Sequence, residues 1–149
     1  MRTYIFDIDG TLAEISHRLH FIGKEPKDWV GFFAACSDDK PIQDVIEVAR
    51  ALGLFVKPTP RIIYLTGRSD AVRRETQYWL FHKHHLPMGE VIMRKDGDHR
   101  PDTQTKRELM EKIVAEGDVI AGVFEDRPSV CRVWREMGLT VFQMSDKEF

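Results

Sequence analysis

The stretch Tyr4-Ile-Phe-Asp-Ile-Asp-Gly-Thr11 decides the fold class of this chain. The apolar residues 4–6 predict a short buried strand, and two carboxylates, Asp7 and Asp9, follow it directly. Gly10 allows the chain to turn and to approach a ligand closely. The stretch therefore predicts a pair of acids at the end of a sheet strand, facing a ligand crevice. The alternative is a structural turn in which Asp9 accepts hydrogen bonds from backbone N–H groups.

The rest of the chain alternates short apolar runs with amphipathic segments. Further strands are predicted at 61–66, 91–93, 119–124 and 140–144, and helices at 42–52 (ending at Gly53), 71–83, 103–116 and 129–137. This order predicts an α/β fold: a Rossmann-like, mainly parallel sheet with helices on both faces. At 149 residues, the chain has the length of a single domain, residues 1–149.

Residues 13–41 interrupt the alternation, because they are too many for a tight connection between a strand and a helix. Trp29, Phe32, Phe33 and Cys36 are spaced at i, i+3, i+4 and i+7, which predicts a short amphipathic helix. We interpret the segment as a small cap insert over the active edge of the sheet. Its aromatic residues could stack on a nucleobase, although burial against the domain also explains their spacing.

Polar residues follow three of the predicted strands, the first of which is followed by Asp7 and Asp9. Thr66 and Arg68 come after the second strand, and Glu125 and Asp126 come after the fourth. The carboxyl ends of parallel strands meet at one edge of a sheet, where ligands bind. The sequence therefore predicts an enzyme whose chemistry is assembled at that edge.

The composition places this chain among ordinary globular proteins and excludes a disordered one. Hydrophobic residues make up 42% and charged residues 31%, and the formal net charge is −2. That charge predicts no global attraction to nucleic acid or to an anionic membrane. No apolar run reaches 18 residues, so no membrane span is predicted. The two cysteines form no C-x-x-C pair, and no signal peptide is visible, so we expect a cytoplasmic protein.

Asp7-Ile-Asp-Gly-Thr-Leu12 resembles the first motif of the haloacid dehalogenase superfamily of phosphohydrolases. Leu65-Thr-Gly-Arg68 is similar to the second motif, Lys106 to the third and Glu125-Asp126 to the fourth. The phosphatase domain of phage polynucleotide kinase-phosphatases is a closer match. That match extends over Gly97–Arg100, Asp102 with Lys106, Glu125–Arg127 and Val133–Leu139.

The resemblance implies catalytic roles for four residues. Asp7 would be the nucleophile that forms an aspartyl-phosphate, and Asp9 the general acid and base. Thr66 would offer a hydroxyl and a backbone N–H to a phosphate oxygen, and Lys106 a positive charge beside the nucleophile. Taken alone, Thr66 also suits a polar residue at a strand end that caps the next helix, and Lys106 suits a solvated helix face.

The resemblance also implies a Mg²⁺ ion, held by Asp7, the backbone carbonyl of Asp9, and Asp126. Carboxylate and carbonyl oxygens are the ligands that this hard cation prefers. Glu125 is a departure, because the related domains more often have aspartate at this position. Its additional methylene group leaves open whether it contacts the metal directly.

The resemblance to the kinase-phosphatase group also implies substrate contacts from Arg18, from Arg68 with its neighbour Gly67, and from Asp102. A guanidinium binds phosphate bidentately, whereas a surface arginine is often only solvated. Asp102 would orient Lys106 or an arginine, cap the following helix, or do both. A basic cluster, Arg94, Lys95, His99 and Arg100, could contact a polynucleotide backbone or be ordinary surface.

The expected activity is that of a Mg²⁺-dependent phosphomonoester hydrolase, and the closer resemblance implies that it removes 3′-phosphate from nucleic-acid ends. One alternative is a phosphatase of free nucleotides or other small phosphomonoesters. A more distant one is a phospho-acceptor signalling domain, although the second and third predicted strands lack the accepting aspartate such a domain places after a central strand. No G-x-x-x-x-G-K-[ST] motif occurs in these residues, so 5′-phosphorylation is not expected from this chain. A kinase or ligase partner would be separate from it.

Overall fold

A five-stranded parallel sheet forms the centre of the molecule, seen here in a computed structural model that describes residues 1–148. Its strands are β1 (Arg2–Phe6), β4 (Arg61–Ser69), β5 (Glu90–Arg94), β6 (Val119–Glu125) and β7 (Val141–Gln143), in the order β5-β4-β1-β6-β7. Every pairing in this sheet is parallel, which confirms the predicted α/β class. Because β1 is the central strand, Asp7 emerges in the middle of the carboxyl edge.

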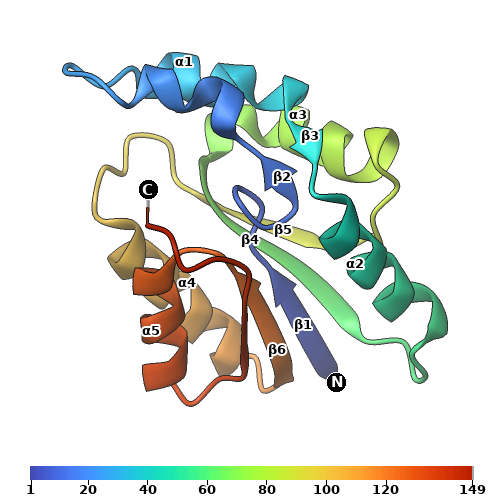
Figure 1. Cartoon of the computed structure of the whole chain (residues 1–149). Helices are drawn as coiled ribbons and strands as arrows, with labels where there is room; N and C mark the ends of the chain where they lie inside the picture. Colours follow the sequence, from blue (N-terminus) through green and yellow to red (C-terminus); the bar gives the residue numbers. More distant parts are fainter. Residues whose placement is uncertain (149) are drawn as a thin grey trace.

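Helices cover both faces of the sheet (Figure 1). One face packs against α4 (Asp102–Ala115) and α5 (Pro128–Glu136), and the other against α2 (Gln43–Phe55) and the helical segment 70–83. The alternation of β4 shows the two layers: Ile62 and Tyr64 pack on the α2 side, and Ile63 and Leu65 on the α4 side. Within residues 1–148, no helix combines the length and hydropathy that a membrane span requires.

Residues 13–41, here called the cap insert, lie beyond the carboxyl end of β1 (Figure 1). They contain an antiparallel pair, β2 (Ala13–Glu14) with β3 (Lys40–Pro41), the 3₁₀ helices η1 (Ser16–Phe21) and η2 (Ala35–Asp38), and α1 (Trp29–Ala34). Asp28 caps α1 by accepting a hydrogen bond from the backbone N–H of Gly31. Phe32 is buried in the core, and this burial attaches the cap insert to the domain.

Two local predictions are wrong, and one small element was not predicted. Helix α2 continues past Gly53 to Phe55, since one glycine costs a helix only about 1 kcal/mol and the packed face of α2 is retained. The predicted helix 71–83 divides into η3 (Asp70–Val72), α3 (Arg73–Gln77) and a π-helix, η4 (Tyr78–Lys83). The β2–β3 pair was not predicted, because strands of two residues have no detectable periodicity.

Candidate active site

The side chains of Lys106 and Asp7 meet at the carboxyl edge of the sheet. Lys106, on α4, donates a hydrogen bond from Nζ to Asp7 Oδ1 at 2.9 Å and another to Glu125 Oε2 at 2.9 Å. All three residues are buried. Burial tends to lower the pKa of Lys106, but Asp102, Asp7 and Glu125 outweigh it and hold that pKa well above its usual value. The ammonium group therefore stays charged beside the predicted nucleophile.

Asp7, Glu125 and Asp126 bring carboxylate oxygens within 4.8 Å of one another. Burial, with the nearby charge of Glu125, raises the pKa of Asp7 well above its usual value, and the same two causes raise the pKa of Asp126 to about 6. Glu125 also accepts hydrogen bonds from the backbone N–H groups of Asp126 and Arg127 at 3.1 and 3.2 Å. Three buried acids facing one ammonium group leave an excess of negative charge, which an oxygen-binding cation would neutralise.

Gly10 allows Asp126 to reach this cluster. Its φ is 83°, and a Cβ at this position would overlap the Asp126 carboxylate. Thr11, whose side chain the sequence analysis did not assign, donates from Oγ1 to Asp126 Oδ1 at 3.3 Å. The turn that follows β1 thus positions two acids. Asp7 lies at the start of the turn, and Gly10 and Thr11 within it contact the carboxylate of Asp126.

Asp9 is bound by two arginines that are completely buried. Arg18 Nη2, Arg68 Nε and Arg68 Nη2 all donate to Asp9 Oδ1, at 2.7, 2.9 and 2.7 Å. Burial tends to raise the pKa of Asp9, but the charges of Arg68 and Arg18 outweigh it and lower that pKa. Both arginines contact Asp9, and neither of them lines the cavity. Their predicted contact with phosphate stays a prediction.

Asp39 completes this network and was missed by the sequence analysis. It is 2% exposed and accepts from Arg18 Nε and Nη2 at 2.8 Å each and from Arg68 Nη2 at 2.9 Å. Its backbone carbonyl accepts from Trp79 Nε1 at 2.9 Å, and Trp79 lies on the π-helix η4. The only signal in the sequence is the acidic pair 38–39, which does not distinguish a buried carboxylate from a solvated one.

Thr66 and Asp102 occupy two further predicted positions. Thr66 is buried in β4 and its Oγ1 accepts the backbone N–H of Arg68 at 3.2 Å, while the next residue, Gly67, lines the cavity. Asp102 lies 3.5 Å from Lys106 Nζ and accepts from Arg94 Nη2 at 3.0 Å. It is the first residue of α4 and makes no capping hydrogen bond, so the structure favours the orienting interpretation over the cap.

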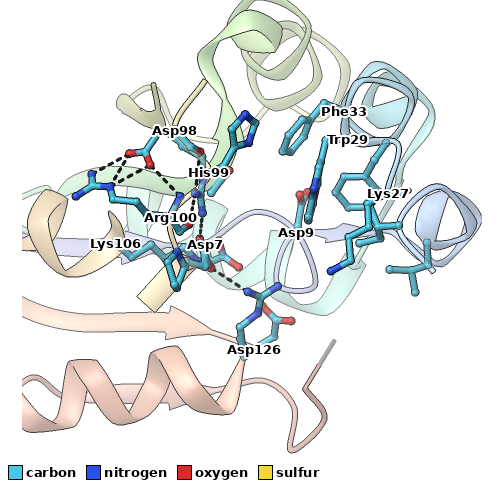
Figure 2. A pocket seen from close by; sticks show the side chains of 18 of the residues that line it. Asp7, Asp9, Lys27, Trp29, Phe33, Asp98, His99, Arg100, Lys106 and Asp126 are labelled. Carbon is cyan, nitrogen blue, oxygen red and sulfur yellow. Dashed lines mark hydrogen bonds and ion pairs between the residues drawn. The ribbon is translucent and has the colours of Figure 1, made fainter. Parts of the chain in front are cut away.

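The acids open into a cavity of about 530 Å³ that also contacts the cap insert. Trp29 and Phe33 form one side of the cavity, and His99, from the loop between β5 and α4, lies on the opposite side (Figure 2). Asp7 and Asp9 line the same cavity and lie below these side chains in this view (Figure 2). A volume in this range suits a small organic group in addition to a phosphate.

The predicted basic cluster is largely committed to internal contacts. Arg94 donates to the backbone carbonyls of Asp98 and Arg100, at 3.1 and 2.7 Å, and to that of Gly67 at 3.0 Å. Arg100 forms ion pairs with Asp98 and Glu108, at 2.8 and 2.7 Å. These contacts hold the 95–101 loop in place and partly neutralise its charge.

This sheet, with acids after β1 and β6 and a lysine from α4, defines the class of haloacid dehalogenase-like hydrolases. A haloacid dehalogenase-like hydrolase from Streptococcus pneumoniae shares the fold, with a TM-score of 0.62 at 13% identity over 95% of this chain and 83% of that one. A family model described as the phosphatase domain of the polynucleotide kinase PNKP matches residues 1–149. The chain belongs to that family.

More similar proteins carry the same domain within longer chains. Two structures, of the Pnkp1/Rnl/Hen1 complex and of the Pnkp1/Rnl/Hen1 RNA repair complex, match at 26% identity over 99% of this chain, with TM-scores of 0.80 and 0.82. A putative bifunctional polynucleotide kinase/RNA ligase of Autographa californica nuclear polyhedrosis virus is 25% identical over 96% of this chain. The chain covers 47%, 43% and 19% of these relatives, respectively.

Proposed function

We propose that this domain hydrolyses phosphomonoesters through an aspartyl-phosphate on Asp7 and that its substrates are 3′-phosphorylated nucleic-acid ends. The observation that carries the proposal is the 2.9 Å contact between Lys106 Nζ and Asp7 Oδ1 beneath an open cavity. A buried carboxylate held by a lysine at the end of a central strand suits attack on phosphorus. Membership of a phosphatase-domain family favours this reaction over a signalling role.

The reaction would take two steps. An oxygen of Asp7 attacks the phosphorus, the bond from phosphorus to the leaving oxygen breaks, and Asp9 donates a proton to that oxygen. Water then attacks the phosphorus, Asp9 accepts the proton of that water, and the bond between Asp7 and phosphorus breaks to release inorganic phosphate. In the domain without substrate, the charges of Arg68 and Arg18 outweigh burial and lower the pKa of Asp9; the negative charge of bound phosphate would act in the opposite direction and favour the protonated carboxyl group.

Asp7, Asp126 and the backbone carbonyl of Asp9 would hold Mg²⁺, with Glu125 beside them. The fit rests on the all-oxygen donor set and on the excess negative charge of three buried acids. When bound, the ion neutralises charge on the phosphoryl oxygens. Lys106 contributes to the same neutralisation from the chain itself.

The experiment measures phosphate release from a 3′-phosphorylated oligonucleotide, with Mg²⁺ or with EDTA. We expect Mg²⁺-dependent turnover in the wild type and none in Asp7→Asn. Asp44→Asn, which changes an exposed aspartate in the first turn of α2, is the matched control and should retain full activity. Turnover by Asp7→Asn at the wild-type rate would contradict the aspartyl-phosphate.

Free nucleotides are the second candidate substrates, because Arg94 and Arg100 are paired internally and the net charge is −2. Rates on a 3′-phosphorylated oligonucleotide and on a 3′-deoxynucleoside monophosphate, at equal concentration, separate the two. A higher kcat/KM on the oligonucleotide supports a polynucleotide end, and a higher value on the mononucleotide supports the alternative.

A kinase or ligase would supply the remaining steps of end repair in this proposal. Support comes from the relatives, whose names describe a kinase/ligase and an RNA repair complex. The two cysteines, Cys36 and Cys131, are free and buried, which suits the reducing cytoplasm that we propose as the location.

A further inference from the structure

We propose that Trp29, Phe33 and His99 form a slot that binds the nucleobase of the terminal nucleotide while its phosphate lies at Asp7. The inference rests on the proposed phosphatase function and adds a recognition element to it. The three side chains are exposed or half-buried, and the proposed hydrolytic mechanism assigns no role to them.

The aromatic side of the slot comes from α1. The rings of Trp29 and Phe33 stack with centroids 5.9 Å apart and an interplanar angle of 26°, and both line the cavity. Trp29 is 40% exposed, whereas the other two tryptophans, Trp79 and Trp134, are 1% exposed. A tryptophan ring left open to a cavity above catalytic groups is a surface on which a planar group can stack.

Phe32 anchors this aromatic side to the catalytic network. It is 3% exposed, and the guanidinium carbon of Arg18 lies 4.3 Å from the centroid of its ring. Arg18 also donates to the backbone carbonyl of Phe32 at 3.3 Å and to Asp9 at 2.7 Å. The same buried arginine therefore holds both Asp9 and the helix that carries Trp29 and Phe33, so their relative position is preorganised.

His99 forms the other side, from a loop that is fixed on both flanks. Arg94 binds the carbonyls of Asp98 and Arg100, the residues directly before and after His99, and Arg100 is paired with Glu108 on α4. The backbone at His99 is thus restrained, while its imidazole faces the cavity opposite Phe33 (Figure 2). Imidazole rings stack on bases as aromatic residues do.

The charge around the slot favours a nucleotide over an uncharged aromatic ligand. Lys27 lines the same cavity, with Nζ 5.8 Å from the centroid of the Trp29 ring. In the part of the chain that the structure describes, Lys27 has no carboxylate within ion-pair distance, in contrast to Arg94 and Arg100. A cation beside an aromatic surface matches a base joined to a phosphate backbone, and stacking tolerates every base.

The experiment compares two 3′-phosphorylated dinucleotides, one ending in thymidine and the other in an abasic residue. Stacking of a base on an aromatic side chain changes affinity roughly 5- to 150-fold. We expect Trp29→Ala to raise the KM for the thymidine substrate about tenfold, with kcat and the KM for the abasic substrate unchanged. Trp29→Phe should restore most of the loss, and Val30→Ala, which changes an 83% exposed neighbour on α1, should have no effect.

Two results with the Trp29→Ala variant would overturn the slot. One is an equal effect of Trp29→Ala on both substrates, which indicates only a structural role for Trp29. The other is no effect on either substrate. A wild type that hydrolyses only base-free esters such as glycerol phosphate overturns the slot and leaves the phosphatase function intact.

Tryptophan fluorescence tests the slot without turnover. Asp7→Asn lacks the nucleophile, so it can bind the thymidine dinucleotide without hydrolysing it. Binding should quench the emission of exposed Trp29, and the quenching should disappear in Asp7→Asn combined with Trp29→Phe. Quenching of equal size in the double variant would contradict the proposal. This measurement decides the slot even if the wild type hydrolyses no phosphomonoester, which would contradict the proposed function alone.

Discussion

Asp39 and Arg18 form a bidentate ion pair that is closed off from solvent. Nε and Nη2 of Arg18 donate to Oδ1 and Oδ2 of Asp39 at 2.8 Å each, and both side chains are 0% exposed. Arg68 joins the pair from β4, and both arginines continue to Asp9. A carboxylate from the cap insert therefore fixes the two guanidinium groups that orient the predicted acid–base residue.

Asp39→Ala should destabilise the domain and strongly reduce turnover. Removing one partner of a buried ion pair costs about 3–5 kcal/mol, because the other charges remain buried without it. Urea unfolding measures the loss, and Asp38→Ala is the control, since Asp38 is exposed and should change stability by less than about 0.5 kcal/mol. Equal stability of the two variants would show that the arginines do not depend on Asp39.

Lys106→Met should lower kcat by roughly 10²- to 10³-fold, the usual effect of removing a preorganised electrostatic group from an active site. The variant leaves Asp7 and Glu125 facing each other without the ammonium that each now contacts at 2.9 Å. Steady-state kinetics on a small phosphomonoester measures the loss. Lys112→Met, at an exposed position of the same helix, is the control. A wild-type kcat in Lys106→Met would remove Lys106 from the mechanism.

Gly10→Ala and Gly117→Ala separate backbone strain from steric overlap. Both glycines have positive φ, 83° and 90°, so each alanine should cost about 1–2 kcal/mol of stability. A Cβ on Gly117 meets nothing within 4 Å, whereas one on Gly10 overlaps the carboxylate of Asp126. We expect Gly117→Ala to retain full activity and Gly10→Ala to lose both activity and further stability. Thermal unfolding and phosphate release measure the difference, and equal activity would contradict the packing at Gly10.

Asp126→Asn should stabilise the metal-free domain and abolish its stabilisation by Mg²⁺. Burial and Glu125 raise the pKa of Asp126 to about 6, so its negative charge at neutral pH destabilises the folded state. Replacing it with a neutral side chain should add on the order of 1 kcal/mol when EDTA is present. Mg²⁺ should raise the Tm of the wild type, because it binds only the folded acid cluster. A similar Mg²⁺ shift in Asp126→Asn would place the metal elsewhere, and Asp44→Asn should behave as the wild type.

Much of the fold could be predicted from local pattern. The alternation of apolar strands with amphipathic helices predicted the parallel sheet, and most element boundaries agree within one or two residues. The segment 71–83 did not follow its predicted helix, because its shape depends on tertiary contacts. Thr76 accepts a hydrogen bond from Arg68, and Trp79 donates one to Asp39. The buried network of arginines and aspartates therefore packs against this segment, part of which is a π-helix and not the predicted α-helix.

The sequence by itself determined that the acidic residues meet at one edge of the sheet. Asp7 and Asp9 follow a buried strand, and Asp126 follows another. The carboxyl ends of parallel strands lie at one edge of a sheet, so the proximity of these acids could be predicted before any contact between them was known. The aromatic spacing in the cap insert also predicted a helix, which is present at Trp29–Ala34.

Only the tertiary structure decided which partner each charged or aromatic side chain takes. Arg18 and Arg68 contact Asp9, Phe32 is buried, and Trp29 lines the cavity, although each of the four had a substrate-binding interpretation in the sequence. The physical reason is the distance along the chain: Asp9 contacts Arg68 across 59 residues and Lys106 contacts Asp7 across 99. Local periodicity reports which face of an element is apolar, but it carries no information about pairings between segments that only folding brings together.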